Sequence, residues 1–248
     1  MSPTIEHLLK QHYNDSIFHT HVSMVGNKGK YQFNRQVLEE LWNEYSQLIE
    51  NNPDTVIGIA EKPQYYTPVL GDIDIMVKEN DELILSDTLY TTEQVETIIK
   101  VYQTVIRNIV EGCTDKDLTC VLLEKVPYRF QKNDITYVKN GFHIHFPWLF
   151  LSKVDQEIYL IPQVKDKLDK LNLFENLGIK KSGDVIDKAC CSVPWLMYGS
   201  RKTETQQPYR VTRIYNHNSD ELNLEEAFAT YQLYDNQDQL INISGRVR

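Results

Sequence analysis

Two aspartates stand inside an otherwise apolar segment, PVLGDIDIMV, at residues 68–77. In an extended chain alternate side chains share a face, so Asp72 and Asp74 point to one side and the aliphatic residues between them to the other. Two carboxylates roughly 7 Å apart at the backbone repel each other and are poorly solvated beside a core. A divalent cation relieves both penalties, because oxygen ligands suit Mg²⁺ and Mn²⁺. A solvated strand end is the alternative, and the pattern alone names no reaction.

A second segment, KNGFHIHFPW, repeats the alternation with histidines. His143 and His145 share one face of the expected strand, and large apolar residues occupy the other. A lone histidine is most often a core residue, whereas two on one face, after a lysine at position 139, indicate a site. Their nitrogens could bind a metal or donate hydrogen bonds to a polyphosphate, and the residues leave both roles open.

A third segment, GDVIDKACCSVPWLMYGSRK, carries another acid and ends in two basic residues. Asp187 follows an apolar run as Asp72 does, whereas Asp184 follows a Ser-Gly pair and is expected in a turn. A two-metal site usually needs a third carboxylate, and Asp187 is the better candidate. Arg201 and Lys202 could neutralise a triphosphate, or they could lie in a solvated loop.

The surrounding patterns predict the elements that hold these residues. Helices are expected over 34–50 and over 91–112, the second opening with a capping box at Thr91 and Gln94 and stopping at Gly112. Strands are expected at 55–61, 68–77, 118–125 and 140–150, with Asn140-Gly141 as a turn just before the last. Further segments are expected to be helical at 154–177, with an interruption at Pro162, extended at 193–200 and 208–216, and helical at 223–232. The alternation indicates an α/β or α+β domain, with room for two lobes.

Composition limits the classes of protein. A chain of 248 residues, 41% hydrophobic, forms one large domain or two small ones. The net charge of −9 argues against a broad basic nucleic-acid surface, although a local groove could still be positive. No membrane partner is expected, because no segment approaches the ~18–20 apolar residues of a span and the N-terminus is no signal peptide. The four cysteines lack zinc-finger or disulfide spacing, so we expect no zinc and an intracellular, reducing setting.

Three blocks in order, DIDI, GFHIHF and VIDKACCSVPWLMYGSRK, resemble the three motifs of the archaeo-eukaryotic primase superfamily. Those motifs are hydrophobic-D-hydrophobic-D/E, small-x-H, and hydrophobic-D followed by a basic residue. With the lead-in segments FHTHVSMVGNKGKYQF and EKPQYYTPVLGDIDI, the resemblance spans residues 18–202 and is nearest to the N-terminal primase domain of primase-helicases from large DNA viruses and mobile elements. It implies an α+β fold, with an RRM-like catalytic sheet packed with helices and an N-terminal α/β lobe.

The resemblance also implies the organisation of the chain. We expect a single catalytic domain over 1–248, with N-terminal elements at about 1–65 and a catalytic core at about 66–215. It would form the N-terminal part of a larger primase-helicase. The implied partners are nucleoside triphosphates, a single-stranded DNA template and a replicative helicase, fused or separate, which would add template affinity to an acidic domain.

By the same resemblance, Asp72, Asp74 and Asp187 are the catalytic metal ligands, for two Mg²⁺ or Mn²⁺ ions. The implied reaction is nucleotidyl transfer onto a 3′-hydroxyl, with stabilisation of charge on the α-phosphate and the leaving pyrophosphate.

The resemblance further implies a set of nucleotide-binding residues. Gly141 takes the small position, His143 contacts the phosphates of the incoming nucleotide, and Lys139 and Lys202 match basic positions that bind the triphosphate. Leu196 stands where some relatives carry an arginine, so Arg201 could compensate for it. His145 lies outside the minimal motif, and its role stays open.

Two other functions compete with this one. HIH also fits a nicking endonuclease, in which His143 and His145 bind one metal and Tyr198, four positions before Lys202, attacks a phosphodiester. That hypothesis leaves Asp187 without a role and ranks second. The other is a template-binding module with a degenerate site, which would tolerate loss of Asp72 or Asp187. A polymerase-β-like enzyme would need a Gly-Ser helix start that EKPQYYTPVLG lacks.

Overall fold

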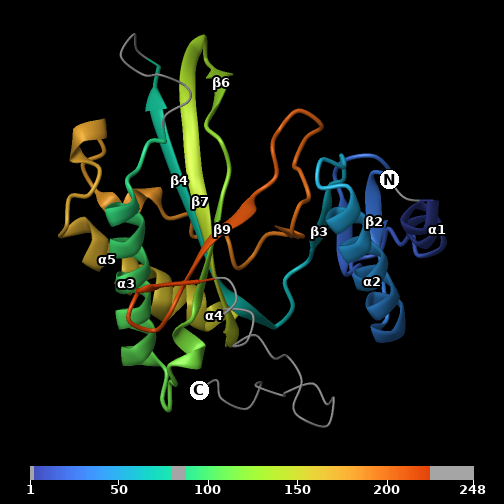
Figure 1. Cartoon of the computed structure of the whole chain (residues 1–248), viewed down its shortest axis with the longest axis horizontal. Coiled ribbons are helices and arrows are strands. Elements are labelled where there is room, and N and C mark those ends of the chain that lie inside the picture. Colours follow the sequence, from blue (N-terminus) through green and yellow to red (C-terminus); the bar gives the residue numbers. More distant parts are fainter. Residues whose placement is uncertain (1–2, 80–87, 224–248) are drawn as a thin grey trace. The chain divides into compact units, whose positions relative to one another are not determined.

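The computed structural model describes residues 3–79 and 88–223, which fold into two compact units (Figure 1). One unit combines Met1–Gln64 with Ser192–Arg210, and the other combines Tyr65–Cys191 with the segment from Val211 onward. Helices mix with antiparallel sheets in both, so the chain has the predicted α+β fold. None of the helices in the described ranges combines the length and apolar character that a bilayer crossing demands.

The first unit packs two helices on a small sheet. Its elements are α1 (Pro3–Gln11), β1 (His21–Ser23), β2 (Gly29–Tyr31), α2 (Arg35–Asn51), β3 (Ile59–Glu61) and β8 (Trp195–Leu196), with sheet order β2-β1-β3-β8. Helix α2, expected over 34–50, begins where the Asn34 side chain accepts a 3.0 Å hydrogen bond from the amide of Val37. The buried face of α2, with Leu41, Tyr45 and Ile49, closes the core of this unit.

The second unit holds the larger sheet. Its strands are β4 (Tyr66–Lys78), β5 (Cys120–Glu124), β6 (Tyr128–Lys132), β7 (Ile135–Ser152), β9 (Arg210–Tyr215) and β10 (Glu221–Leu222), in the order β10-β9-β5-β7-β4, with β6 paired to β7. Its α-helices are α3 (Thr92–Ile109), α4 (Lys153–Asp155) and α5 (Ile161–Asp169). Shorter turns of helix are η1 (Lys116–Leu118), η2 (Gln156–Leu160), η3 (Glu175–Leu177) and η4 (Ser182–Val185).

Helix α3 packs on one face of this sheet, and the polar residues of the predicted site lie on the opposite face. The predicted capping box is present, because Thr91 and Gln94 exchange side-chain-to-backbone hydrogen bonds. Tyr102, on the buried stripe of α3, stacks on Phe146 of β7 with ring centres 6.1 Å apart. Helices α3 and α5 lie side by side in Figure 1. Since side chains alternate along β7, His143 and His145 project from the face that α3 does not cover.

The turn predicted at Asn140-Gly141 is wrong, because both residues lie inside the 18-residue strand β7. The Asn140 side chain is buried and bonds two backbone groups, the amide of Leu89 (2.9 Å) and the carbonyl of Lys125 (3.2 Å). Position 141 requires glycine because of its packing and not because of a turn. A Cβ there would lie 2.0 Å from the carbonyl oxygen of Ile73 in β4. The actual turn precedes β7, at Asn133 and Asp134, whose φ angles are 50° and 59°.

Two other expectations have a mixed outcome. Residues 153–169 run continuously through α4, the π-turn η2 and α5. Pro162 lies in the first turn of α5, where its missing amide hydrogen is tolerated, and the wider π-turn comes directly before it. Of the extended segment 193–200, only β8 is a strand. The helix expected over 223–232 lies outside the described residues from position 224 on.

Candidate metal centre

The pairing of β4 with β7 fixes the positions of the first two carboxylates. Asp72 is opposite His143 and Asp74 is opposite Gly141. Directly opposed residues of antiparallel strands project from the same face, so both aspartates share the face of the histidines. Because Gly141 has no side chain, β7 passes close to β4 next to Asp74.

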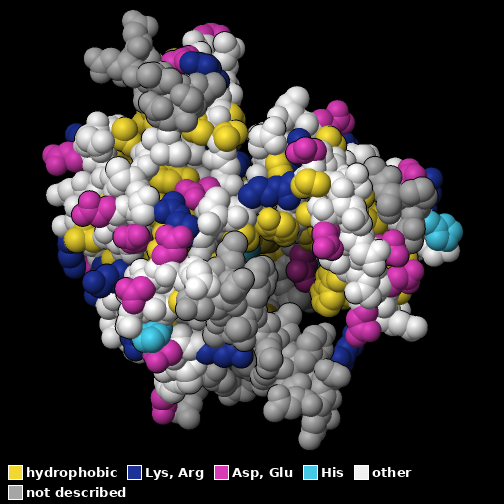
Figure 2. Space-filling view, in the orientation of Figure 1, with side chains coloured by type: hydrophobic (Ala, Val, Ile, Leu, Met, Phe, Trp, Pro, Cys, Tyr) yellow, Lys and Arg dark blue, Asp and Glu magenta, His cyan; other side chains and the backbone are white. Residues whose placement is uncertain are grey.

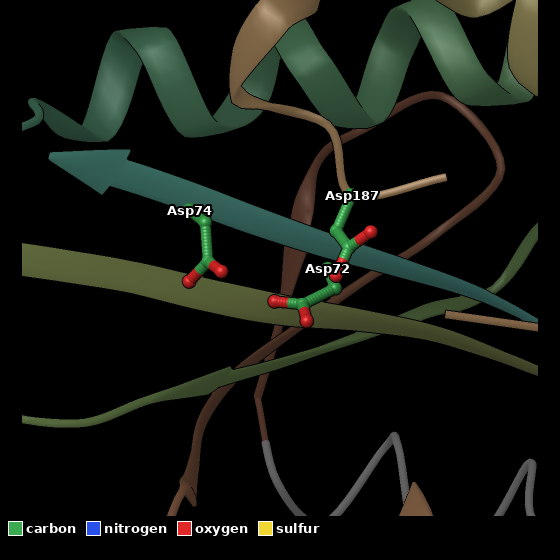
Figure 3. Close-up of side chains that lie close together, drawn as sticks. All are labelled: Asp72, Asp74 and Asp187. Atoms are coloured by element: carbon green, nitrogen blue, oxygen red, sulfur yellow. The ribbon is translucent and has the colours of Figure 1, made fainter. Parts of the chain in front are cut away.

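Asp187 reaches this site along the free edge of β4. Ile186 forms an antiparallel bridge with Ile73, which places Asp187 beside Asp72. The amide of Asp187 donates a 2.9 Å hydrogen bond to the carbonyl of Asp72. Figure 3 shows the two carboxylates next to each other, with Asp74 further along β4. One carboxylate oxygen from each of the three residues lies within 4.8 Å of the other two.

Helix α5 packs against η4, the turn that shortly precedes Asp187 in the chain. The amide of Gly183, in η4, donates a 2.8 Å hydrogen bond to a carboxylate oxygen of Asp169. A Cβ on Gly183 would lie 2.8 Å from the carbonyl of Lys165, so only glycine lets η4 approach α5 this closely. Asp184 is exposed on the same turn, as its predicted turn position requires.

His143 and two lysines stabilise the charge on Asp72. Burial alone would raise the pKa of this carboxyl, but the adjacent His143 and the positive charges of two lysines outweigh burial and lower the pKa. The His143 Nε2 lies 3.4 Å from an oxygen of Asp72. The nearby charges are those of His143, Lys139 and Lys125. Asp72 is therefore ionised and ready to ligate a cation at neutral pH.

Asp74 has the opposite balance. Burial and the charge of Asp72 raise its pKa, although the Nζ of Lys139 lies 2.6 Å from its Oδ2. In turn Asp74 raises the pKa of Lys139 against the effect of burial. The single positive charge of Lys139 therefore offsets only part of the negative charge of Asp72 and Asp74.

This donor set fits a hard divalent cation. All three side chains offer carboxylate oxygens, the ligands that Mg²⁺ and Mn²⁺ prefer. Burial and the repulsion from Asp72 both raise the pKa of Asp74, and a bound cation would offset both penalties. The residues present therefore match a divalent metal centre better than a purely structural ion-pair cluster.

His145 differs from His143 in its surroundings. Its backbone pairs with Leu70 of β4 and Val121 of β5, and its ring lies 6.4 Å from that of His143, centre to centre. Burial, followed by the charge of His143, lowers the pKa of His145 to about 3. Its ring is therefore neutral at neutral pH, and its part in the site stays a prediction.

Three other predicted residues, Tyr198, Arg201 and Lys202, belong to the first unit. Arg201 is buried there, where its guanidinium donates to the carbonyl of Asp54 (3.0 Å) and its amide to the carbonyl of Ile57 (2.7 Å). These bonds give Arg201 a structural role within its own unit. Lys202 is exposed. Tyr198 is also exposed, with the Arg210 guanidinium 5.6 Å from its ring centre.

The sequence did not single out two residues near the aspartates. Lys125 directly follows β5, and its charge lowers the pKa of both Asp72 and Asp74. Its Nζ lies 5.0 Å from the ring centre of Tyr128, which starts β6. The available signal for Lys125 was its place at the end of the expected strand 118–125. Tyr128 had no such signal, because β6 is short and its residues are mixed in type. On the face drawn in Figure 2, acidic and basic side chains are interspersed, in a chain with 35 acidic and 26 basic residues.

The chain matches one family model and three viral proteins. Residues 20–215 match the family described as the C962R protein N-terminal AEP domain, where AEP denotes archaeo-eukaryotic primase. The chain is 33% identical over 235 residues, 91% of its length, to “Putative helicase 121R” of Invertebrate iridescent virus 3. It is 32% identical over 222 residues, 85% of its length, to “Putative helicase 184R” of Invertebrate iridescent virus 6, and 27% identical over 84% of its length to a similarly named protein, 022R, of Frog virus 3.

These relatives are much longer proteins. The aligned regions cover 24%, 23% and 20% of their lengths, so the chain spans about a quarter of the relatives that it matches. The family match covers all three motif blocks, from Asp72 to Lys202. The chain therefore belongs to the archaeo-eukaryotic primase superfamily, in the family of C962R N-terminal domains of large DNA viruses.

Proposed function

We propose that the chain is the catalytic domain of a DNA primase or primase-polymerase, which synthesises short primers on a DNA template. The observation that carries the proposal is the convergence of Asp72, Asp74 and Asp187 within 4.8 Å beside a lysine and a histidine. Family membership supports a nucleotidyl-transfer reaction at such a cluster.

In this proposal the three aspartates hold two Mg²⁺ or Mn²⁺ ions. Bound cations would stabilise the attacking 3′-oxygen and the charge on the leaving pyrophosphate. His143 and Lys139 orient the triphosphate, and Gly141 lets β7 pass close to β4 beside Asp74. The predicted triphosphate-binding role of Lys202, a residue of the first unit, stays a prediction. Lys139 would exchange its contact with Asp74 for one with a phosphate when substrate binds.

The partners of the domain are part of the same proposal. The relatives are named as helicases and extend well beyond the matched region. A helicase, fused or separate, would hold the template near a domain whose net charge of −9 disfavours tight DNA binding by itself. We place this activity inside the host cell, wherever the viral or mobile replicon is copied.

The testing experiment supplies unprimed single-stranded DNA, labelled nucleotides and Mn²⁺ or Mg²⁺. The proposal requires oligonucleotide products from the wild type and from Tyr198→Phe, and none from Asp72→Ala. A covalent link between DNA and Tyr198, without any synthesis, would instead establish the nicking endonuclease. Full replication function in Asp72→Ala would establish the degenerate template-binding module.

A further inference from the structure

Three aromatic rings extend along the β6–β7 hairpin, away from the aspartates. Tyr128 is paired with Lys139, and Phe130 is paired with Tyr137. Lys139 is also paired with Met76 of β4, one alternation beyond Asp74. Since opposed residues project from the same face, the rings lie on the face of the sheet that carries the metal centre.

The rings contact one another and remain accessible. The ring centres of Tyr128 and Phe130 lie 6.4 Å apart, and Phe130 stacks on Tyr137 at 5.6 Å with an interplanar angle of 22°. All three side chains are half-buried, so each supports its neighbour and leaves part of its surface to solvent. We refer to Tyr128, Phe130 and Tyr137 as the aromatic row.

Lysines flank the aromatic row. The Nζ of Lys125 lies 5.0 Å from the ring centre of Tyr128, and Lys139 is directly opposite that tyrosine. Further along, Lys78 is paired with Tyr137, and Lys132 is paired with Ile135 at the end of the hairpin. Both Lys78 and Lys132 are exposed. Lys139 is already paired with Asp74 at 2.6 Å, so Lys78 and Lys132 are the exposed lysines that remain beside the aromatic row.

Two acidic residues lie near these exposed lysines in the sequence. Asp134 is exposed in the turn of the hairpin, two positions after Lys132. Glu79 follows Lys78 and so projects from the opposite face, where it pairs with Arg129. Cross-strand aromatic pairs also stabilise a hairpin by themselves, but that role does not require flanking lysines. Flat rings beside cations match a ligand with flat bases and an anionic backbone.

We propose that the aromatic row is a stacking surface for unpaired bases of a single-stranded DNA template, with Lys78 and Lys132 beside its phosphates. The proposal rests on the proposed function, because it identifies the strand as the template. Successive same-face positions on a strand are roughly 6.8 Å apart, about twice the per-strand rise of duplex DNA. The aromatic row therefore suits an extended strand with its bases separated.

The first test needs no variant. Fluorescence anisotropy would compare binding of the wild type to a normal oligonucleotide of about ten nucleotides and to an abasic one of equal length, in EDTA and without nucleotides. Both carry the same phosphates, so only stacking distinguishes them. We expect the abasic strand to bind at least about fivefold more weakly. Equal affinity would overturn the proposal.

The second test assigns the stacking to the aromatic row. Phe130→Leu keeps the apolar packing and removes a ring, and we expect the Kd for the normal strand to rise about fivefold or more. Tyr159→Leu is the matched control, because Tyr159 is an exposed tyrosine on η2 of the same unit, and its Kd should stay within about twofold of wild type. Unchanged DNA binding in Phe130→Leu would overturn the proposal. Lys78→Ala should lower the slope of log affinity against log salt by about 0.7.

These measurements separate the proposal from the proposed function. Binding in EDTA does not depend on catalysis, so Asp72→Ala should bind the normal strand as the wild type does. Discrimination against the abasic strand without primer synthesis would remove the proposed function and leave a single-strand binding site. Synthesis without that discrimination would remove the stacking surface alone. A higher KM for nucleotides with unchanged DNA affinity in Phe130→Leu would assign the ring to the incoming base and overturn the proposal.

Discussion

The amide of Asp187 donates a hydrogen bond of 2.9 Å to the carbonyl oxygen of Asp72, although the two residues are far apart in the sequence. With the bridge between Ile186 and Ile73, this bond fixes the third carboxylate by backbone geometry. Side-chain rotation alone therefore does not assemble the cluster. Its position depends on the edge of β4 and on η4, which packs against α5.

Gly141→Ala should destabilise the second unit strongly. The added Cβ would lie 2.0 Å from the carbonyl oxygen of Ile73, and a backbone atom cannot rotate away as a side chain can. We expect the free energy of unfolding to fall by about 3 kcal/mol or more, measured by denaturant titration.

Gly178→Ala provides the control for this substitution. Gly178 has a φ of 75° and no atom near an added Cβ, so only backbone strain of about 1 kcal/mol is expected. A loss in Gly141→Ala that is no larger than the loss in Gly178→Ala would show that β4 and β7 can separate at little cost.

Lys139→Met should separate nucleotide binding from metal binding. If Lys139 holds the triphosphate, its loss should raise the KM for nucleotides about tenfold or more. Mn²⁺ binding should not weaken, because the ammonium that lies 2.6 Å from Asp74 no longer competes for that carboxylate. Steady-state kinetics and Mn²⁺ titration measure the two quantities.

Lys170→Met is the matched control for Lys139→Met. Lys170 pairs with Asp166 at 2.6 Å on the exposed side of the unit, so its loss should change neither quantity. An unchanged KM in Lys139→Met would remove this lysine from the triphosphate site, and lost Mn²⁺ binding would make it a support of the metal centre.

The stability of the first unit should depend on the protonation of His21. Burial lowers the pKa of this histidine from 6.5 to about 4. Between these values the unfolded chain binds a proton that the folded chain does not, so stability falls as the pH falls from about 6.5 toward 4. From about pH 7 to about pH 5 the loss from this residue is about 2 kcal/mol.

His21→Leu should remove this part of the pH dependence. The comparison is the difference in unfolding free energy between about pH 7 and about pH 5, taken for the wild type and the variant. The Nε2 of His21 has no hydrogen-bond partner among the described residues, and its Nδ1 lies 3.0 Å from the hydroxyl of Thr20. In His21→Leu that hydroxyl keeps its contacts with the amide of Phe33 and the carbonyl of Tyr31. Equal pH dependence in the two proteins would contradict a buried, neutral His21.

Short sequence patterns correctly predicted the features that depend only on neighbouring residues in the chain. The capping box of Thr91 and Gln94 and the buried stripe of α3 follow from residues within one helix, and both are present. Asn140-Gly141 misled the prediction because the dipeptide is typical of hairpin turns, whereas its actual neighbours come from β4 and the loop before α3. The surroundings of these two residues become visible only once β7 is paired with β4, which is far away in the sequence.

The clustering of the three aspartates was predictable from the sequence, but the residues around them were not. Alternation along β4 placed Asp72 and Asp74 on one face, and the motif order added Asp187. Lys125 and the aromatic row stayed hidden, because β6 is a five-residue strand whose polar and aromatic residues give no clear period. The guanidinium of Arg201 donates to the carbonyl of Asp54 in its own unit, a contact that the sequence pattern did not indicate, and its predicted nucleotide-binding role stays a prediction.

The most direct test of the central claim compares two aspartates of one short segment. Asp187→Asn should lower template-directed nucleotide incorporation by about a thousandfold or more, because it removes a carboxylate from the cluster of three aspartates and keeps the side-chain size. Asp184→Asn, on the exposed turn just before it, should stay within about twofold of wild type. Incorporation that survives in Asp187→Asn as well as it does in Asp184→Asn would contradict a polymerising site built on Asp72, Asp74 and Asp187.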